Sequence, residues 1–188
     1  MIEIFLDLAQ AFGLSTSAGL NAYIPLLATA LFAKFTPWIT LEEPWTFLTS
    51  WGIIALITVL LLIETFADKI PVVDNVNNIV QTLVRPTAGA IVFAASTQSN
   101  INIHPAFALG CGVLLAGSVH VVKSGSRPVL AAMTGGVADP VVSTIEDIIA
   151  TLTTFIALIF PWLIVLWLIL LLALVVMVMR WRRNRRMA

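Results

Sequence analysis

Residues 161–179 form the most apolar part of the chain, PWLIVLWLILLLALVVMVM, and contain no charged side chain. A helix needs roughly 20 apolar residues to cross the hydrocarbon core of a bilayer, so this run predicts a membrane-spanning helix. The composition agrees, because 60% of the residues are apolar and 11% are charged, against about half and about a quarter in soluble domains. We therefore expect a single integral membrane domain over residues 1–188.

Further hydrophobic stretches predict an all-α, polytopic membrane helix bundle of about six spans. The predicted spans are 10–33, 47–66, 86–98, 105–122, 140–159 and 161–179. The third span is short unless the residues before it join the same helix. The last two are separated by FPW at 160–162, and they form either a tight hairpin or one long helix kinked at Pro161.

Short runs of small residues recur near the predicted starts of the odd-numbered spans. They are TSAG at 16–19, PTAG at 86–89 and MTGG at 133–136. This recurrence arranges the six spans as three hairpins, each opened by a segment that allows close packing. The alternative is that small residues simply let membrane helices approach one another.

The basic residues predict the orientation of the bundle. The tail at 180–188, RWRRNRRMA, carries five of the ten basic residues, and segments rich in Lys and Arg stay on the cytoplasmic side. With six spans both termini are cytoplasmic, as are four further cations: Lys69, Arg85, Lys123 and Arg127. Five spans would require all four to be translocated, so six spans are favoured.

An unusually polar stretch follows the second span at residues 64–86, ETFADKIPVVDNVNNIVQTLVRP. Pro71 cannot continue the preceding helix, and Asp74 is a good N-cap residue. Apolar positions then recur with helical spacing between 76 and 84, with Asn and Gln on the opposite face. This amphipathic segment is too short and too polar to span, so we expect it at the cytoplasmic interface or folded against the bundle.

Glu64 lies about one turn before the end of the second span, with Asp68 one turn later and Lys69 beside it. Charges within membrane segments are costly and usually face a cavity or a partner. One interpretation is a structural salt bridge from Glu64 to Lys69 or Lys123. The other is a part in handling an ion or solute.

A second polar cluster occupies the fifth predicted span. Asp139 before Pro140 predicts an N-cap followed by proline in the first helical turn. Glu146 and Asp147 lie on the polar side of this helix, about 10 Å further along. Two neighbouring carboxylates at or within the membrane boundary are typical of proton-coupled and cation-handling sites.

The first predicted span contains neutral polar residues, namely the run Ser15–Ser17 and Asn21. Local unwinding at Gly19 or a kink at Pro25 would free backbone carbonyls, as in the broken helices that bind ions in transporters. The alternative is that these residues serve only helix packing.

Motifs for catalysis or cofactor binding are absent from the sequence. It contains no HExxH, no Gly-x-Ser-x-Gly, no Walker loop and no dinucleotide fingerprint. His104 and His120 fall on opposite sides of the membrane in the six-span arrangement, so they do not predict a shared metal site. We therefore expect no enzyme, no cofactor, no metal and no nucleic-acid partner.

Four segments resemble a known family of bacterial membrane proteins. They are SAGLNAYIPLL, ETFADKIPVVDNV, LVRPTAG and TGGVADPVVSTIED. Together they are similar to the family called domain of unknown function 4126, over nearly the whole chain. The resemblance implies a polytopic protein of the inner membrane and implies no particular activity.

The polar residues favour a transporter or channel for an ion or small solute. Its candidate path residues are Glu64, Asp68, Lys69, Asp74, Asn21, Glu146 and Asp147. Its candidate charge partners are Arg85, Lys123 and Arg127. A bundle of this size encloses a pore most readily as a homo-oligomer, with membrane lipids around it. The alternative is a scaffold, assembly factor or lipid-organising protein in which the same charges are buried structural pairs.

Overall fold

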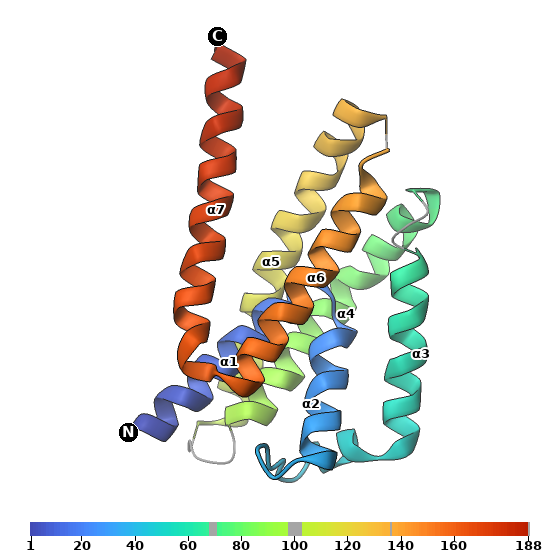
Figure 1. Ribbon diagram of the computed structural model, residues 1–188. Helices are drawn as coiled ribbons and strands as arrows, with labels where there is room; N and C mark the ends of the chain where they lie inside the picture. Colours follow the sequence, from blue (N-terminus) through green and yellow to red (C-terminus); the bar gives the residue numbers. More distant parts are fainter. Residues whose placement is uncertain (68–70, 98–102, 136, 188) are drawn as a thin grey trace.

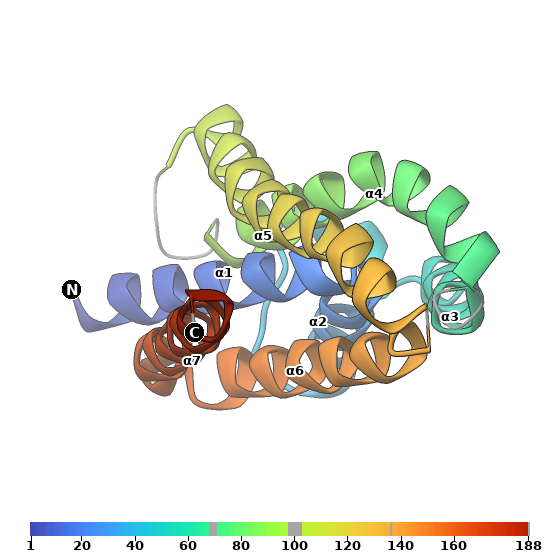
Figure 2. The same ribbon diagram turned by 90° about the horizontal axis from the view of Figure 1, so that it is seen from above.

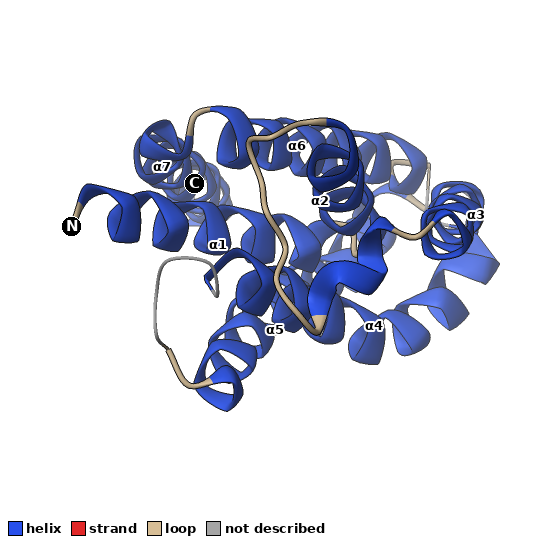
Figure 3. Cartoon of the chain, turned by 90° about the horizontal axis from the view of Figure 1, so that it is seen from below, coloured by secondary structure: helices blue, strands red, loops and turns tan. Residues whose placement is uncertain are grey.

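The computed structural model describes residues 1–67, 71–97, 103–135 and 137–187, and the regular structure in these ranges is entirely helical (Figure 3). The helices are α1 (Ile2–Leu20), α2 (Tyr23–Phe35), the short 3-10 helix η1 (Trp45–Thr49), α3 (Trp51–Ala67), α4 (Pro71–Thr97), α5 (Pro105–Thr134), α6 (Asp139–Ile159) and α7 (Pro161–Met187) (Figure 1). The predicted all-α class is confirmed.

Helix α1 lies at the centre of the array and contacts α2, α4, α5, α6 and α7, as the view from above in Figure 2 shows. Small residues let its neighbours approach closely. A side chain at Gly13 would collide with Ala157 and Ile164, and one at Gly19 would collide with Val119. Close backbone approach of this kind is how membrane helices gain packing contacts without a hydrophobic driving force.

The predicted first span, 10–33, is two helices and not one. α1 ends at Leu20, and Figure 1 shows α2 returning to the lower end of the array from which α1 came. Asn21 is extended, with φ −144° and ψ 120°. Its Oδ1 accepts hydrogen bonds from the amides of Tyr23 and Ile24 at 3.1 and 3.2 Å. The side chain supplies an acceptor for amides at the start of α2, which stabilises the break.

The remaining helices alternate in direction. α3, α5 and α7 run toward the upper end of Figure 1, whereas α4 and α6 run toward the lower end. The last two predicted spans form the tight hairpin and not the long kinked helix. α6 ends at Ile159, Phe160 has φ −131° and ψ 63°, and α7 starts at Pro161.

Helix α4 departs from the prediction of a separate cytoplasmic segment followed by a short third span. The two form one helix from Pro71 to Thr97, with Pro86 inside it. α5 likewise passes Pro128 and extends to Thr134, beyond the predicted end at 122. Proline is tolerated within membrane helices because neighbouring groups satisfy the freed backbone.

Three helical segments are long and apolar enough to cross a membrane by length and composition. They are Ile79–Thr97, Pro105–Thr134 and Asp139–Ile159. Shorter apolar helices are Tyr23–Phe35, Trp51–Ala67 and Pro161–Leu174. These helices suggest a membrane protein, and within the described residues three of the six predicted spans reach the required length.

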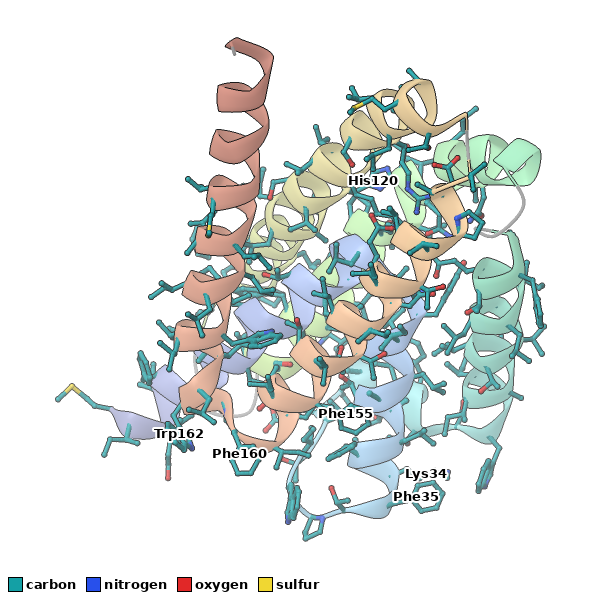
Figure 4. The ribbon with its side chains drawn as sticks, turned by 45° about the horizontal axis from the view of Figure 1, so that its top comes forward. Lys34, Phe35, His120, Phe155, Phe160 and Trp162 are labelled. Carbon is teal, nitrogen blue, oxygen red and sulfur yellow. The ribbon has the colours of Figure 1, made fainter. Side chains whose placement is uncertain are left out.

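Aromatic side chains gather at the lower end of the array. Phe35 is exposed there beside Lys34, and Phe160 and Trp162 are exposed near the turn between α6 and α7 (Figure 4). The ammonium group of Lys34 lies 4.6 Å from the ring centroid of Trp51, the first residue of α3. Exposed aromatic residues of this kind are enriched where a membrane meets water. The lower end therefore has the residue content of a membrane interface.

The two termini lie at opposite ends of the array in Figure 1, the N-terminus at the lower end and the C-terminus at the upper end. The α1–α2 pair returns to its own end, and the five helices from α3 to α7 then alternate. Three of the described helices have the length and composition to cross a membrane. The cytoplasmic placement of both termini stays a prediction.

Candidate functional site

The break between α1 and α2 lies against charged side chains of α5 and α6. The carbonyl oxygen of Leu20 accepts a hydrogen bond from Nζ of Lys123 at 2.8 Å. Carbonyl groups at a helix end have no partner within their own helix, so α5 supplies one to the end of α1. Lys123 is 4% exposed, and its ammonium group is therefore held inside the bundle.

Glu146 connects α6 to two cations of α5. Its Oε2 lies 3.1 Å from Nζ of Lys123 and 2.7 Å from NH2 of Arg127. Lys123 and Arg127 project from the same face of α5, because they are four residues apart. The two predicted charge partners thus lie beside one of the predicted acids.

Asn21 and Asp147 join the helix break to α6. Nδ2 of Asn21 donates a hydrogen bond to Oδ1 of Asp147 at 3.0 Å. One turn earlier on α1, Oγ of Ser17 donates to the carbonyl oxygen of Ala150 at 2.8 Å and lies 2.7 Å from Oγ1 of Thr154. Polar side chains therefore connect α1 to α6 over successive turns, up to the residue at which α1 breaks.

A second buried group contains Glu64, Arg85 and His120. NH2 of Arg85 donates to Oε1 of Glu64 at 2.9 Å, and its NH1 lies 3.3 Å from Nδ1 of His120. Nε2 of His120 lies 3.2 Å from Oγ1 of Thr82. Arg85 is 0% and Glu64 1% exposed. The group connects α3, α4 and α5, with a salt bridge at its centre.

Arg85, which the sequence did not name as a partner of Glu64, forms a salt bridge with it, and the predicted bridge from Glu64 to Lys69 stays a prediction. The sequence suggested Lys69 or Lys123, but Arg85 pairs with Glu64, whereas Lys123 contacts Leu20 and Glu146. Lys69 lies outside the described residues.

Tyr23 links the helix break with the second group. Its hydroxyl group is hydrogen-bonded to the side chain of Gln81, and the charges of Glu64 and Arg85 act on it. Gln81 lies one turn before Arg85 on α4 and is 2% exposed. The start of α2 and the Glu64–Arg85 pair therefore belong to one connected polar region.

Both groups lie deep in the helical array. Glu64 is about 20 Å from Trp51 along α3, and Glu146 is about 20 Å from Ile159 along α6, at about 1.5 Å rise per residue. A hydrocarbon core of about 30 Å that begins at the aromatic lower end encloses both positions. Figure 4 shows His120 in the upper half of the array, away from the labelled aromatic residues.

The structure does not describe the side chains of two further predicted site residues. Asp68 lies outside the described residues, and Asp74 lies in α4 with a side chain that is likewise outside them. Asp139 was predicted as an N-cap, but it is the first residue of α6, and Ala138 is the N-cap, with no side-chain capping bond. Its predicted capping role is therefore wrong.

Four residues of the polar region were not predicted as site residues: Tyr23, Gln81, Thr82 and His120. For the last three the signal in the sequence is helical spacing, since Gln81 and Thr82 precede Arg85 by four and three positions and His120 precedes Lys123 by three. Residues with these spacings lie on one face of a helix. The spacing identifies the face, but it cannot show that α4 and α5 bring the two faces together.

Apolar cavities lie apart from the charged residues. A groove of about 440 Å³ between α1 and α7 is lined by Phe5, Phe12, Ile164 and other apolar residues. A smaller cavity of about 240 Å³ lies between α2 and α4, with Leu26 and Leu83 in its lining.

The apolar helices suggest a helical membrane protein. The chain belongs to the family described as Domain of unknown function (DUF4126), whose model matches residues 8–181, as the resemblance predicted. No curated protein and no solved structure matches the chain.

Proposed function

We propose that this protein is a transporter or channel for an ion or small charged solute. The observation that supports the proposal is the break at Asn21, where the end of α1 and the start of α2 contact Lys123 and Asp147 inside the bundle. Broken helices with ionisable partners at the membrane midplane are typical substrate and coupling-ion sites of transporters.

The energetics of the buried charges favour a functional role over a purely structural one. Well-packed apolar residues often give equal or greater stability than a buried salt bridge. A membrane protein that needed only a stable bundle would gain little from Glu64, Arg85, Lys123 and Glu146 in its interior. Ionisable residues within membrane segments are accordingly functional-site candidates.

The donors and acceptors at the break can bind a charged solute by exchange of partners. A cation would take the Leu20 carbonyl and the Asp147 carboxylate in place of Lys123 and Asn21. An anion would take Lys123 and Arg127 in place of Glu146. In either case the solute replaces contacts that hold α1 and α2 against α5 and α6, so binding is linked to movement of the helix break.

The proposed orientation has the upper end in the cytoplasm of a bacterial cell and the helices in its inner membrane. The arginine-rich tail ends α7 at that end, and Arg85, Lys123 and Arg127 lie nearer to it than Lys34 does. Positive charges accumulate on the cytoplasmic side. Membrane lipids and further copies of the chain are the proposed partners, and we propose no enzymatic activity.

A scaffold or lipid-organising protein is the second candidate, and one observation favours it. The predicted path acids whose side chains are described, Glu64, Glu146 and Asp147, each accept a hydrogen bond from another side chain. Complete pairing of this kind would stabilise a fixed arrangement of helices without any solute.

Flux through purified protein in liposomes tests the two candidates. The wild type, Glu146→Gln and Asp147→Asn would be screened with protons, monovalent and divalent cations and common anions. Glu42→Gln is the matched control, because Glu42 is exposed. We expect one species to move, and its flux to fall in the first two variants while they remain folded. Absence of flux for every species, with both variants unstable in detergent, would support the scaffold.

A further inference from the structure

The hydrogen-bond partners of His120 determine its protonation state. Its Nδ1 faces NH1 of Arg85 at 3.3 Å and its Nε2 faces Oγ1 of Thr82 at 3.2 Å. A guanidinium group can only donate hydrogen bonds. Nδ1 must therefore be the unprotonated acceptor, so the imidazole is neutral and carries its hydrogen on Nε2, which donates to the Thr82 hydroxyl group.

Charged or titratable groups from several helices surround His120, whereas α1, which packs against α5, supplies the carbonyl group of Leu20. Arg85 comes from α4, Glu64 from α3 through its salt bridge with Arg85, and Tyr23 from α2. Lys123 follows one turn later on α5 and contacts Leu20 and Glu146. His120 itself is 2% exposed. Any change of its charge is therefore felt by groups on four helices and not by bulk water.

A proton on Nδ1 and the contact with Arg85 exclude each other. A protonated imidazole has two donors and no acceptor, so the Arg85–His120 hydrogen bond breaks when the N–H bond forms. Two cations about 3 Å apart in a low-dielectric interior repel strongly. Arg85 then has Glu64 as its remaining partner in the group, and the side chains of α4 and α5 separate.

We propose that His120 is the proton-binding site that couples movement of the helix break to protons. This inference rests on the proposed transport function and names its coupling ion. The proton comes from water on the side to which the polar region opens, and it leaves to water when Arg85 returns. The separation of these side chains reaches the break by two routes, through Lys123 to Leu20 and through Gln81 to Tyr23.

Nitrogen NMR of His120 in lipid bilayers tests the protonation states directly. The chain contains two histidines, so His104→Gln leaves His120 as the single imidazole. We expect one neutral form with hydrogen on Nε2 near neutral pH, and conversion to the doubly protonated ring on acidification while the protein stays folded. Hydrogen on Nδ1, or a ring that stays neutral until the protein unfolds, would overturn the proposal.

A flux measurement tests the coupling with a conservative variant. In His120→Gln the amide oxygen can accept from Arg85 and the amide nitrogen can donate to Thr82, so the variant mimics the neutral ring but binds no proton. We expect flux in His120→Gln to lose its response to an imposed pH gradient, and His104→Gln to keep it. An unchanged response in folded His120→Gln would refute coupling at this residue. The expected NMR result without flux of any species would instead refute transport and leave the proton site standing.

Discussion

Arg85 is the residue on which the second polar group depends, because it contacts both Glu64 and His120 while being inaccessible to solvent. A buried charge that loses its partner keeps the cost of its desolvation and loses the compensating attraction. Glu64 would lose its salt bridge with Arg85 if an apolar residue replaced Arg85. This reasoning does not hold for residues on the exposed surface, because water solvates a charge there.

We expect Arg85→Met to lower the free energy of unfolding by about 3–5 kcal/mol. The double variant Glu64→Leu with Arg85→Met should recover part of this loss, because both charges of the salt bridge are removed together. The free energy that is not recovered reflects the hydrogen bond that His120 loses. Unfolding of the purified proteins in detergent measures both. Glu42→Gln, at an exposed position, should stay within about 0.5 kcal/mol of wild type. A similarly small effect for Arg85→Met would contradict the burial argument.

Asn21 gives a second prediction at the residue scale, since its amide group both accepts from two backbone amides and donates to Asp147. Asn21→Ala should lower stability by about 2 kcal/mol or more, because hydrogen bonds to two backbone amides and to a charged group are lost together. Asn21→Asp keeps the acceptor but places a second carboxylate beside Asp147. We expect the stability of Asn21→Asp to approach that of wild type only at low pH, where one of the two carboxylates is protonated. If Asn21→Asp and Asn21→Ala lost the same stability at every pH, the result would argue against the Asp147 contact.

At the scale of elements, the crossing of α4 and α5 sets the distance between Arg85 and His120. The two helices touch at Gly89 and Gly112, where a side chain on Gly112 would collide with the backbone of Gly89 and Ala90. Backbone cannot move aside as a flexible side chain can. The crossing therefore fixes how closely the polar faces of α4 and α5 approach.

Gly112→Ala should accordingly destabilise the protein by about 1–3 kcal/mol through overpacking. Gly110→Ala is the matched control on the same helix, because a side chain at Gly110 meets no atom within 4 Å, and alanine there should be neutral or stabilising. Chemical denaturation of the two variants in detergent compares them. Indistinguishable stabilities would show that α4 and α5 do not pack as described.

Hydropathy predicted the elements whose ends coincide with changes in composition. The start of α5 at Pro105 follows from proline at the beginning of an apolar run. Proline also marked an interruption at 160–162, but hydropathy left a hairpin and a kinked helix as alternatives there. The break at Asn21 could not be located in this way, because one extended residue within an apolar stretch barely changes a hydropathy average. The continuity of α4 through Pro86 was left as an alternative in the sequence, and the structure shows it, since a proline within a membrane helix does not end it.

The candidate site was predictable in its composition but not in its pairing. Asn21, Glu146 and Asp147 were expected to act together, and the structure brings Asn21 to Asp147. Glu64 and Arg85 are paired across two helices, and no local spacing rule connects residues so distant in sequence. Such pairs depend on which helices are neighbours. The periodicity of a single helix carries no information about its neighbours.

At the scale of the whole molecule, the α1–α2 pair determines the topology. Because it returns to its own end, the N-terminus and the C-terminus lie at opposite ends (Figure 1). We expect a cysteine at Glu3 to react with a membrane-impermeant thiol reagent in intact cells, and one at Thr134 to react only after permeabilisation, both in a Cys111→Ala background. Protection of the cysteine at position 3 in intact cells would favour the six-span arrangement with both termini inside.

Water access to the helix break is the measurement that separates a transport site from a structural brace most directly. Ala22 and Ala11 are both 0% exposed, but Ala22 lies at the break and Ala11 in the packed part of α1. Both cysteines are introduced in a Cys111→Ala background. We expect a small hydrophilic thiol reagent to modify Ala22→Cys in the folded, membrane-embedded protein, because a transport site opens to water during its cycle. Ala11→Cys should stay unmodified. Equal protection of both cysteines would contradict a solute path at the break and leave the polar region as a fixed support of the bundle.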